Sequence, residues 1–142
     1  MAQTALKVLT VAEKLVEKGY FKTFVSLLRE TGIYDMLNDI NSGPYTILAP
    51  NDYDFFNLPQ ETFDKLMNDK AYLKKVMLNH IIQGELLAHD MLYKRSVRNM
   101  AGNDLYFDTA NGLSVNDVRI IEQDIICDNG VLQVLGSVLT RV

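Results

Sequence analysis

The sequence predicts an α+β fold, because helical and strand patterns occupy different parts of the chain. Amphipathic helical patterns fill the first half, and runs rich in β-branched and aromatic residues follow Arg98. Two Asn-Gly pairs, Asn111-Gly112 and Asn129-Gly130, lie among these later runs, and such pairs favour tight hairpin turns. Helices first and strands afterwards indicate segregated elements instead of alternating βαβ units.

Residues 4–30 are expected to form two amphipathic helices, separated by Gly19 at the position of a C-terminal cap. Their two apolar stripes comprise Val8, Leu9, Ala12, Leu15 and Val16, then Tyr20, Phe21, Phe24, Val25 and Leu28. Thr31-Gly32 ends the second helix, and a short segment from Ile33 to Leu37 follows.

All three prolines fall in the next stretch, where they bracket a strand at Tyr45–Ala49 and a short turn of helix. We expect Asn51 or Asp52 to cap this helical turn, because short polar side chains can accept a hydrogen bond from the first backbone N–H groups. Phe55 and Phe56 are then expected to enter the core.

Two further helices are expected before the strands. Pro59 opens the first, with Glu61 close to the positive end of the helix dipole. Residues 70–82 show the clearest helical pattern, with one face formed by Tyr72, Leu73, Val76, Met77, His80 and Ile81. Strands are predicted at Leu105–Asp108, Leu113–Val115, Val118–Ile126 and Val131–Leu135. We expect Asn129 to adopt a positive φ and to begin the final hairpin.

Composition indicates one globular domain over residues 1–142, with 48% hydrophobic and 23% charged residues. The net charge of -4 argues against nucleic acid, because a phosphate partner needs a clustered basic face. The single cysteine, Cys127, excludes an internal disulfide framework. No apolar run approaches membrane-spanning length, and the N-terminus lacks a signal-peptide pattern.

No pattern indicates catalysis, and we expect no metal or cofactor. Asp52-Tyr53-Asp54 begins like a calcium loop but lacks the glycine and closing glutamate of an EF-hand. His80 and His89 do not have the spacing of a zinc site. Gly136-Ser137-Val138 lacks the nucleophile elbow. Cys127 has no nearby base, so we expect a shielded, unpaired thiol.

Two segments resemble the signature motifs of the fasciclin (FAS1) domain family. Thr46-Ile-Leu-Ala-Pro-Asn-Asp-Tyr-Asp-Phe55 is similar to Thr-Val-Phe-Ala-Pro-Thr-x-x-Ala-Phe. Asn129-Gly-Val-Leu-Gln-Val-Leu-Gly-Ser-Val-Leu139 is similar to Asn-Gly-Val-Ile-His-Val-Ile-Asp-x-Val-Leu, and departs from it at Gln133 and Gly136. The resemblance spans almost the whole chain and implies a single fasciclin-type β-sandwich wedge flanked by several α-helices.

The same resemblance implies a non-enzymatic interaction or cell-adhesion module. Its partner would be a protein or a cell-surface or matrix component, and its location extracellular, periplasmic or at the cell surface. The sequence leaves a cytoplasmic location open, because it carries no signal-peptide pattern. Carriage of a small apolar ligand such as a carotenoid, known for some members of the family, is the alternative function.

The resemblance also implies two places for partner binding. Asp124-Ile125 lies where fasciclin domains carry an Asp-Ile dipeptide implicated in receptor binding. From the residues alone, the pair is a strand segment with Asp124 in solvent and Ile125 packed inward. Asn79-His80 corresponds to a Tyr-His motif for adhesion, with Asn79 in place of the tyrosine. From the residues alone, His80 is a half-buried hydrogen-bonding residue.

Overall fold

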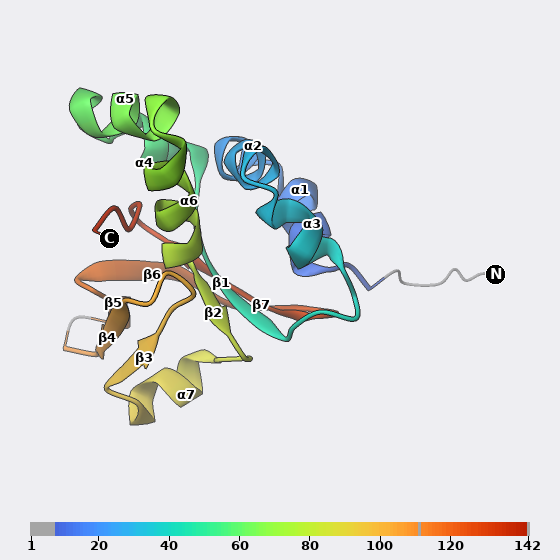
Figure 1. Cartoon of the computed structure of the whole chain (residues 1–142). Helices are drawn as coiled ribbons and strands as arrows, with labels where there is room; N and C mark the ends of the chain where they lie inside the picture. Colours follow the sequence, from blue (N-terminus) through green and yellow to red (C-terminus); the bar gives the residue numbers. More distant parts are fainter. Residues whose placement is uncertain (1–7, 111, 142) are drawn as a thin grey trace.

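The structure is a computed structural model that describes residues 8–110 and 112–141 (Figure 1). The helices in this part of the chain are α1 (Val11–Lys18), α2 (Lys22–Glu30), α3 (Ile33–Asn38), α4 (Asp52–Phe56), α5 (Gln60–Asn68), α6 (Lys70–Asn79) and α7 (Ala88–Tyr93). The strands are β1 (Tyr45–Pro50), β2 (Ile81–Gln83), β3 (Ser96–Arg98), β4 (Asp104–Asp108), β5 (Ser114–Val115), β6 (Val118–Cys127) and β7 (Gly130–Leu135). The α+β class is confirmed.

Local capping explains where the first helix and α4 begin. The Thr10 hydroxyl accepts a hydrogen bond from the Glu13 N–H, and the Glu13 carboxylate accepts one from the Thr10 N–H. This capping box starts α1 at Val11, so Val8 lies outside the helix and is exposed. Asn51 forms the same reciprocal arrangement with Asp54 and caps α4, which selects Asn51 from the two predicted caps, Asn51 and Asp52.

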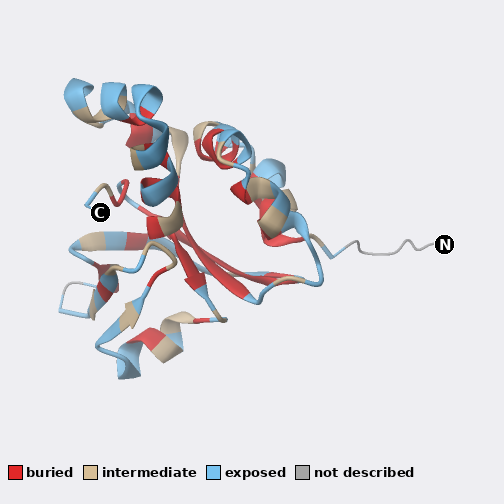
Figure 2. Ribbon diagram, in the orientation of Figure 1, coloured by how far each residue is buried: buried red, intermediate tan, exposed pale blue. Residues whose placement is uncertain are grey.

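One sheet runs through the molecule in the order β2-β1-β7-β6-β5-β4-β3. The central pair, β1 and β7, is parallel, whereas the other pairs are antiparallel. All six residues of each central strand are buried, because both faces of this part of the sheet are covered (Figure 2). Such strands are expected to lack the alternation of a half-exposed strand.

Two apolar cores fill the two sides of this central pair. On the helical side, buried residues of α1 to α6 form one apolar cluster with residues of β1 and β7, among them Ile47 and Leu132. On the other side, Leu48 of β1 meets Leu105 of β4 and Ile120 of β6. The β3–β5 half of the sheet therefore folds over the β2-β1-β7 half, and this arrangement forms the wedge that the family resemblance implied (Figure 1).

The helix predicted over residues 70–82 is too long. It ends at Asn79, and residues 81–83 form β2, which pairs antiparallel with β1 through Thr46 and Ile82. Sheet pairing outweighs the helical periodicity at this point. Phe56 is a second correction: it is 81% exposed, because α4 ends there with only its Phe55 side directed into the core.

The predicted conformation of Asn129 is wrong. Asn129 does lie in the turn of the final hairpin, because Asp128 and Asn129 form the two-residue turn between Cys127 and Gly130. However, Asn129 is not in the positive-φ region. The positive-φ pair is instead Asn116-Asp117, with φ values of 48° and 66°, which joins β5 to β6. The other Asn-Gly pair for which a tight turn was predicted is Asn111-Gly112, and its Asn111 lies outside the described residues.

Asn129 is held by tertiary hydrogen bonds that local turn preferences do not reveal. Its side-chain oxygen accepts a hydrogen bond from the Val11 N–H at 2.9 Å. Its side-chain nitrogen donates to the carbonyl oxygens of Leu37 at 2.8 Å and Asp39 at 3.2 Å. One buried amide therefore ties the start of β7 to α1 and to the end of α3.

Gly130 is required by the close approach of β7 to β1. A Cβ atom added to Gly130 would lie 2.0 Å from the carbonyl oxygen of Tyr45, its partner in the parallel ladder. Both groups belong to the backbone of central strands, so neither can move without breaking the ladder. Gly19 is different, because it has a φ of +82° but open space around its Cβ position.

We expect Gly130→Ala to lower the free energy of unfolding by at least about 3 kcal/mol or to prevent folding, because the methyl group displaces a central strand. Gly19→Ala is the matched control and should cost only about 1–2 kcal/mol, the strain of a left-handed conformation. Urea unfolding of both variants measures the difference. Equal losses would show that the contact with Tyr45 relaxes freely.

Candidate functional site

Asp124 lies in an irregular part of β6. The pairing register with β7 shifts between Ile120 and Glu122 and again between Glu122 and Ile125. Asp124 has a φ of 57° at the second shift, a conformation that Asp tolerates better than most residues. The side chain is exposed, whereas Ile125 is half-buried and packs against the helical-side core. These exposures agree with the interpretation from the residues alone; the bulge was not predicted.

A buried glutamine fixes Asp124 in this bulge. The Asp124 N–H donates to Gln133 Oε1 at 3.0 Å, and Gln133 Nε2 donates to Asp124 Oδ1 at 2.7 Å. The same Gln133 nitrogen donates to the Leu86 carbonyl oxygen at 3.2 Å. Asp124 Oδ1 also accepts a hydrogen bond from the Ala88 N–H at 2.9 Å. The carboxylate is thereby held between β7 and the first residue of α7.

The other carboxylate oxygen, Oδ2, has no hydrogen-bond partner among residues 8–110 and 112–141, so it is available at the surface. The same strand exposes two large apolar side chains, Ile121 at 55% and Ile126 at 61%. The outer part of β6 therefore offers one rigid negative charge with apolar groups along the same strand. We refer to Asp124, Ile121 and Ile126 as the β6 surface.

Asn79 is buried and all of its side-chain hydrogen-bonding groups are used. Its Nδ2 donates to the carbonyl oxygens of Leu139 at 2.9 Å and Arg141 at 2.8 Å. Its Oδ1 accepts hydrogen bonds from Asn99 at 2.6 Å and Asn103 at 3.2 Å. An amide can both donate twice and accept twice, so Asn79 joins the end of α6 to two other segments.

His80 is fully buried, which corrects the expectation of a half-buried residue. Its Nδ1 lies 2.7 Å from the carbonyl oxygen of Val76, and its Nε2 accepts a hydrogen bond from the Leu139 N–H at 2.8 Å. A carbonyl can only accept and an amide N–H can only donate, so the ring is neutral with its proton on Nδ1. Burial lowers the pKa of His80 to about 4.

Asn79 and His80 thus form hydrogen bonds with the backbone of residues 136–141, which we term the C-terminal strap. Tyr72 also contributes, since its hydroxyl donates to the Thr140 carbonyl oxygen at 3.3 Å. The structure does not bring this cluster together with Asp124: no hydrogen bond joins the two sets among the described residues. His80 offers no surface to a partner, and Asn79 is 1% exposed.

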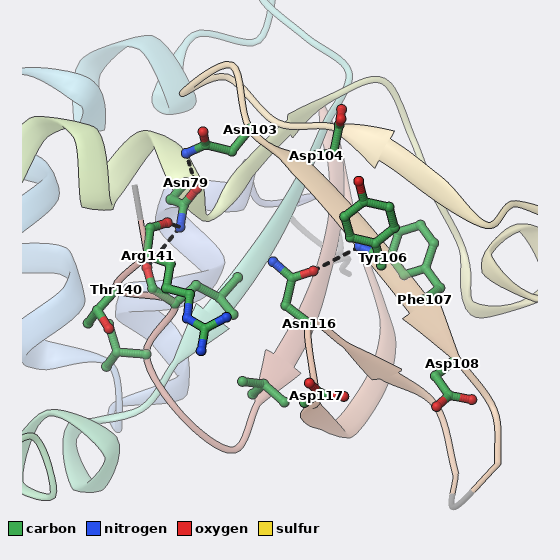
Figure 3. Close-up of a pocket in the computed structure, with 13 residues that line it drawn as sticks. Asn79, Asn103, Asp104, Tyr106, Phe107, Asp108, Asn116, Asp117, Thr140 and Arg141 are labelled. Atoms are coloured by element: carbon green, nitrogen blue, oxygen red, sulfur yellow. Dashed lines mark hydrogen bonds between the residues drawn. The ribbon is translucent and has the colours of Figure 1, made fainter.

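A groove of about 850 Å³ lies between the C-terminal strap and the β4–β5 hairpin, and we term it the strap groove (Figure 3). Nothing in the sequence pattern indicated it, because its walls come from four separate segments. They are lined by Asn79, Asn103, Asp104, Tyr106, Phe107, Asp108, Asn116, Asp117, Val118, Val138, Leu139, Thr140 and Arg141.

Cys127 is buried and unpaired, in agreement with the expected shielded thiol. Its Sγ lies 3.5 Å from the Ile125 carbonyl oxygen. Burial raises the pKa of the Cys127 thiol to about 11, so the reactive thiolate is scarce at neutral pH.

Within residues 8–110 and 112–141, no group of three or more His, Cys, Asp or Glu side chains is arranged to hold a metal ion. In the same part of the chain, no helix is both long and apolar enough to cross a bilayer.

Comparison with known proteins assigns the family. The model of the fasciclin domain matches residues 19–141, which include both signature segments. The chain therefore belongs to the fasciclin domain family. Among solved structures, the chain is similar to a FAS1 domain pair from the insect cell adhesion molecule fasciclin I, with a TM-score of 0.67 and 21% identity. That match covers 87% of this chain and 46% of the insect protein chain, and it shows a shared fold.

Relatives of different length share the domain. The chain is 27% identical over 129 residues to the uncharacterized protein sll1735 of Synechocystis, covering 91% of this chain and 96% of that protein. It is 28% identical over 132 residues to human periostin, covering 89% of this chain but only 15% of periostin. Pig transforming growth factor-beta-induced protein ig-h3 is 26% identical, with 84% and 17% covered.

The buried His80 predicts a pH dependence of stability. The unfolded chain gains the proton near pH 6.5, but the folded protein gains it only near pH 4. The free energy of unfolding should therefore fall as the pH drops through this window, by roughly 3 kcal/mol from this residue. Urea unfolding at several pH values measures the slope, which His80→Gln should flatten and the exposed-site control His89→Gln should not.

The tautomer of His80 can be measured on the parent protein, so this second test does not require that a His80 variant folds. Nitrogen NMR at pH 7 should show protonated Nδ1 and unprotonated Nε2 in His80. A ring that titrates near pH 6.5 in the native protein would contradict the buried, doubly bonded geometry.

Cys127 should react slowly with a thiol reagent in the native protein and at least about 100-fold faster in urea, because unfolding exposes the thiol and restores its ordinary pKa. The absorbance of released thionitrobenzoate measures both rates. Similar rates in the two states would place Cys127 at the surface.

Proposed function

We propose that this domain is a non-enzymatic interaction module that attaches to a protein or matrix partner at a cell surface through the β6 surface. The observation that supports the proposal most directly is the rigid carboxylate of Asp124, in which Oδ1 accepts two hydrogen bonds and Oδ2 has no partner among the described residues. The similarity in fold to the insect cell adhesion molecule fasciclin I supports an adhesive function for this surface.

The physical roles of the β6 surface follow from its chemistry. A charge at the rim of an interface sets specificity, while buried apolar area supplies affinity. Asp124 provides the charge, and the exposed side chains of Ile121 and Ile126 provide the apolar area. Ile125 completes the proposed site by packing inward and fixing the strand. Asn79 and His80 are buried and hold the C-terminal strap, so the proposed surface does not include them.

The proposed setting is outside the cytoplasm, in the extracellular or periplasmic space or at the cell surface. It rests on membership of the fasciclin family and on the likeness to a cell adhesion molecule. A folded domain without disulfides is compatible with this setting, since about two-thirds of the unfolded surface is buried in a chain of this length.

Asp124→Asn should weaken attachment at least about tenfold while changing the free energy of unfolding by less than about 1 kcal/mol. Asparagine keeps an acceptor at Oδ1 and tolerates the positive φ, whereas the charge and the free acceptor oxygen Oδ2 are lost. The measurement is retention of the source organism's own cells on plates coated with each protein, beside urea unfolding of each protein.

Asp35→Asn, a change of an exposed carboxylate on α3, is the matched control and should retain the parent's attachment. The proposal fails if the parent retains no more cells than an albumin coating. It also fails if the folded Asp124→Asn protein attaches as strongly as the parent, because the carboxylate would then play no part.

Carriage of a small apolar ligand is the second candidate function. A groove of about 350 Å³ between α1 and α2 favours it, with an apolar lining that includes Leu15, Val16, Phe21 and Val25. This volume is near the lower limit for ligand sites, which is why attachment is the first candidate. A visible absorption band in protein purified from its source would support carriage of a pigment, and a colourless protein would contradict it.

A further inference from the structure

The strap groove is a second candidate binding site, and it shares no residue with the β6 surface. Its volume of about 850 Å³ falls in the range of small-molecule sites, roughly 300–1,000 Å³. Its apolar lining comes from Phe107, Val118, Val138 and Leu139, of which the last two are buried. The remaining lining is polar, which makes the groove unlike an apolar carrier pocket.

One wall of the groove is a strand face with a tight turn beside it. Asp104, Tyr106 and Asp108 alternate along β4, so they share one face of the strand. The Tyr106 N–H donates to Asn116 Oδ1, and the Asn116 N–H donates to the Tyr106 carbonyl oxygen, both at 2.9 Å. These two bonds fix the Asn116-Asp117 turn against β4 (Figure 3).

The opposite wall is equally constrained. Asn79 holds the carbonyl oxygens of Leu139 and Arg141, and the Tyr72 hydroxyl holds that of Thr140. The side chains of Thr140 and Arg141 are therefore carried on an anchored backbone. Figure 3 shows Arg141 extending across the groove toward the side that carries Asn116. A preformed site of this kind loses little conformational freedom on binding.

Several polar groups of these walls have no partner among residues 8–110 and 112–141. They are the Asn103 Oδ1, the Tyr106 hydroxyl, the Asn116 Nδ2, the Asp117 carboxylate, the Thr140 hydroxyl and the Arg141 guanidinium. The set contains donors as well as acceptors. It also contains one carboxylate and one guanidinium, planar groups that can each bond two neighbouring hydroxyls.

We propose that the strap groove binds a neutral saccharide. A sugar ring presents hydroxyls that both donate and accept hydrogen bonds, and its apolar face can lie against an aromatic ring such as that of Tyr106, which is 60% exposed. An anionic ligand would meet the carboxylates of Asp104, Asp108 and Asp117. A cationic ligand would meet Arg141, and Asp104 is already paired with Arg98 at 3.3 Å.

Nitrogen–proton NMR titration of the folded protein tests the proposal directly. The probes are maltotriose, cellotriose, β-1,4-mannotriose and β-1,4-galactotriose at millimolar concentration, with trigalacturonate as the anionic comparison. At least one neutral probe should cause saturable shifts confined to residues 103–108, 116–118 and 138–141. Trigalacturonate should bind at least about tenfold more weakly.

Tyr106→Ala should weaken binding of the active probe about tenfold, and Arg141→Gln should weaken it by a similar factor. Tyr93→Ala is the matched control, because Tyr93 is an exposed tyrosine on α7 and does not line the groove. All three proteins should keep the parent's melting temperature. Asp124→Asn should bind the saccharide normally, which separates this proposal from attachment through the β6 surface.

The proposal is overturned if no neutral probe causes saturable shifts in the groove. It is also overturned if trigalacturonate binds more tightly than the neutral probes, or if folded Tyr106→Ala binds as tightly as Tyr93→Ala.

Discussion

The parallel contact between β1 and β7 is the constraint on which the rest of the structure depends. At its start the two backbones approach so closely that the Gly130 position has no room for a Cβ atom beside the Tyr45 carbonyl. The neighbouring Asn129 amide binds the backbone of α1 and of the α3 end, so the helical layer and the central strands are fixed at one point. Both signature segments meet here, although more than seventy residues separate their starting points, Thr46 and Asn129. The two signature segments are therefore linked by their packing in the fold.

The remaining tertiary links extend from this pair in both directions. On one side, the Leu48 N–H donates to the His80 carbonyl oxygen at 2.7 Å, which attaches the end of α6 to β1. On the other side, β7 continues into the C-terminal strap, whose Leu139 N–H donates to the His80 ring. One residue thus contacts both signature segments. Its neutral ring suits this position, because a buried charge without a partner would cost several kcal/mol.

The sequence predicted those parts of the fold that depend on local pattern. Local pattern predicted the α+β class, the strand that begins at Tyr45, a cap at Asn51 or Asp52, and the exposure of Asp124. Tertiary contacts decided the rest. Asn129 gives up the positive φ that an Asn-Gly pair favours, because three hydrogen bonds to distant backbone groups hold its side chain. The short β3 and α7 elements escaped prediction because so few residues carry little periodicity. The strap groove could not be predicted, since its walls meet only after the sheet folds over.

The β6 bulge shows how a departure from a family motif acquires a structural role. Gln133 stands where histidine is common in the family, and its side chain makes three hydrogen bonds: it accepts from the Asp124 N–H and donates to Asp124 Oδ1 and to the Leu86 carbonyl oxygen. A neutral histidine has only one donor and one acceptor, so it could not make all three. The glutamine therefore allows Asp124 to adopt a positive φ within a strand while its backbone and one carboxylate oxygen remain satisfied. In this chain the position of the surface carboxylate is set by a fully buried side chain of the neighbouring strand.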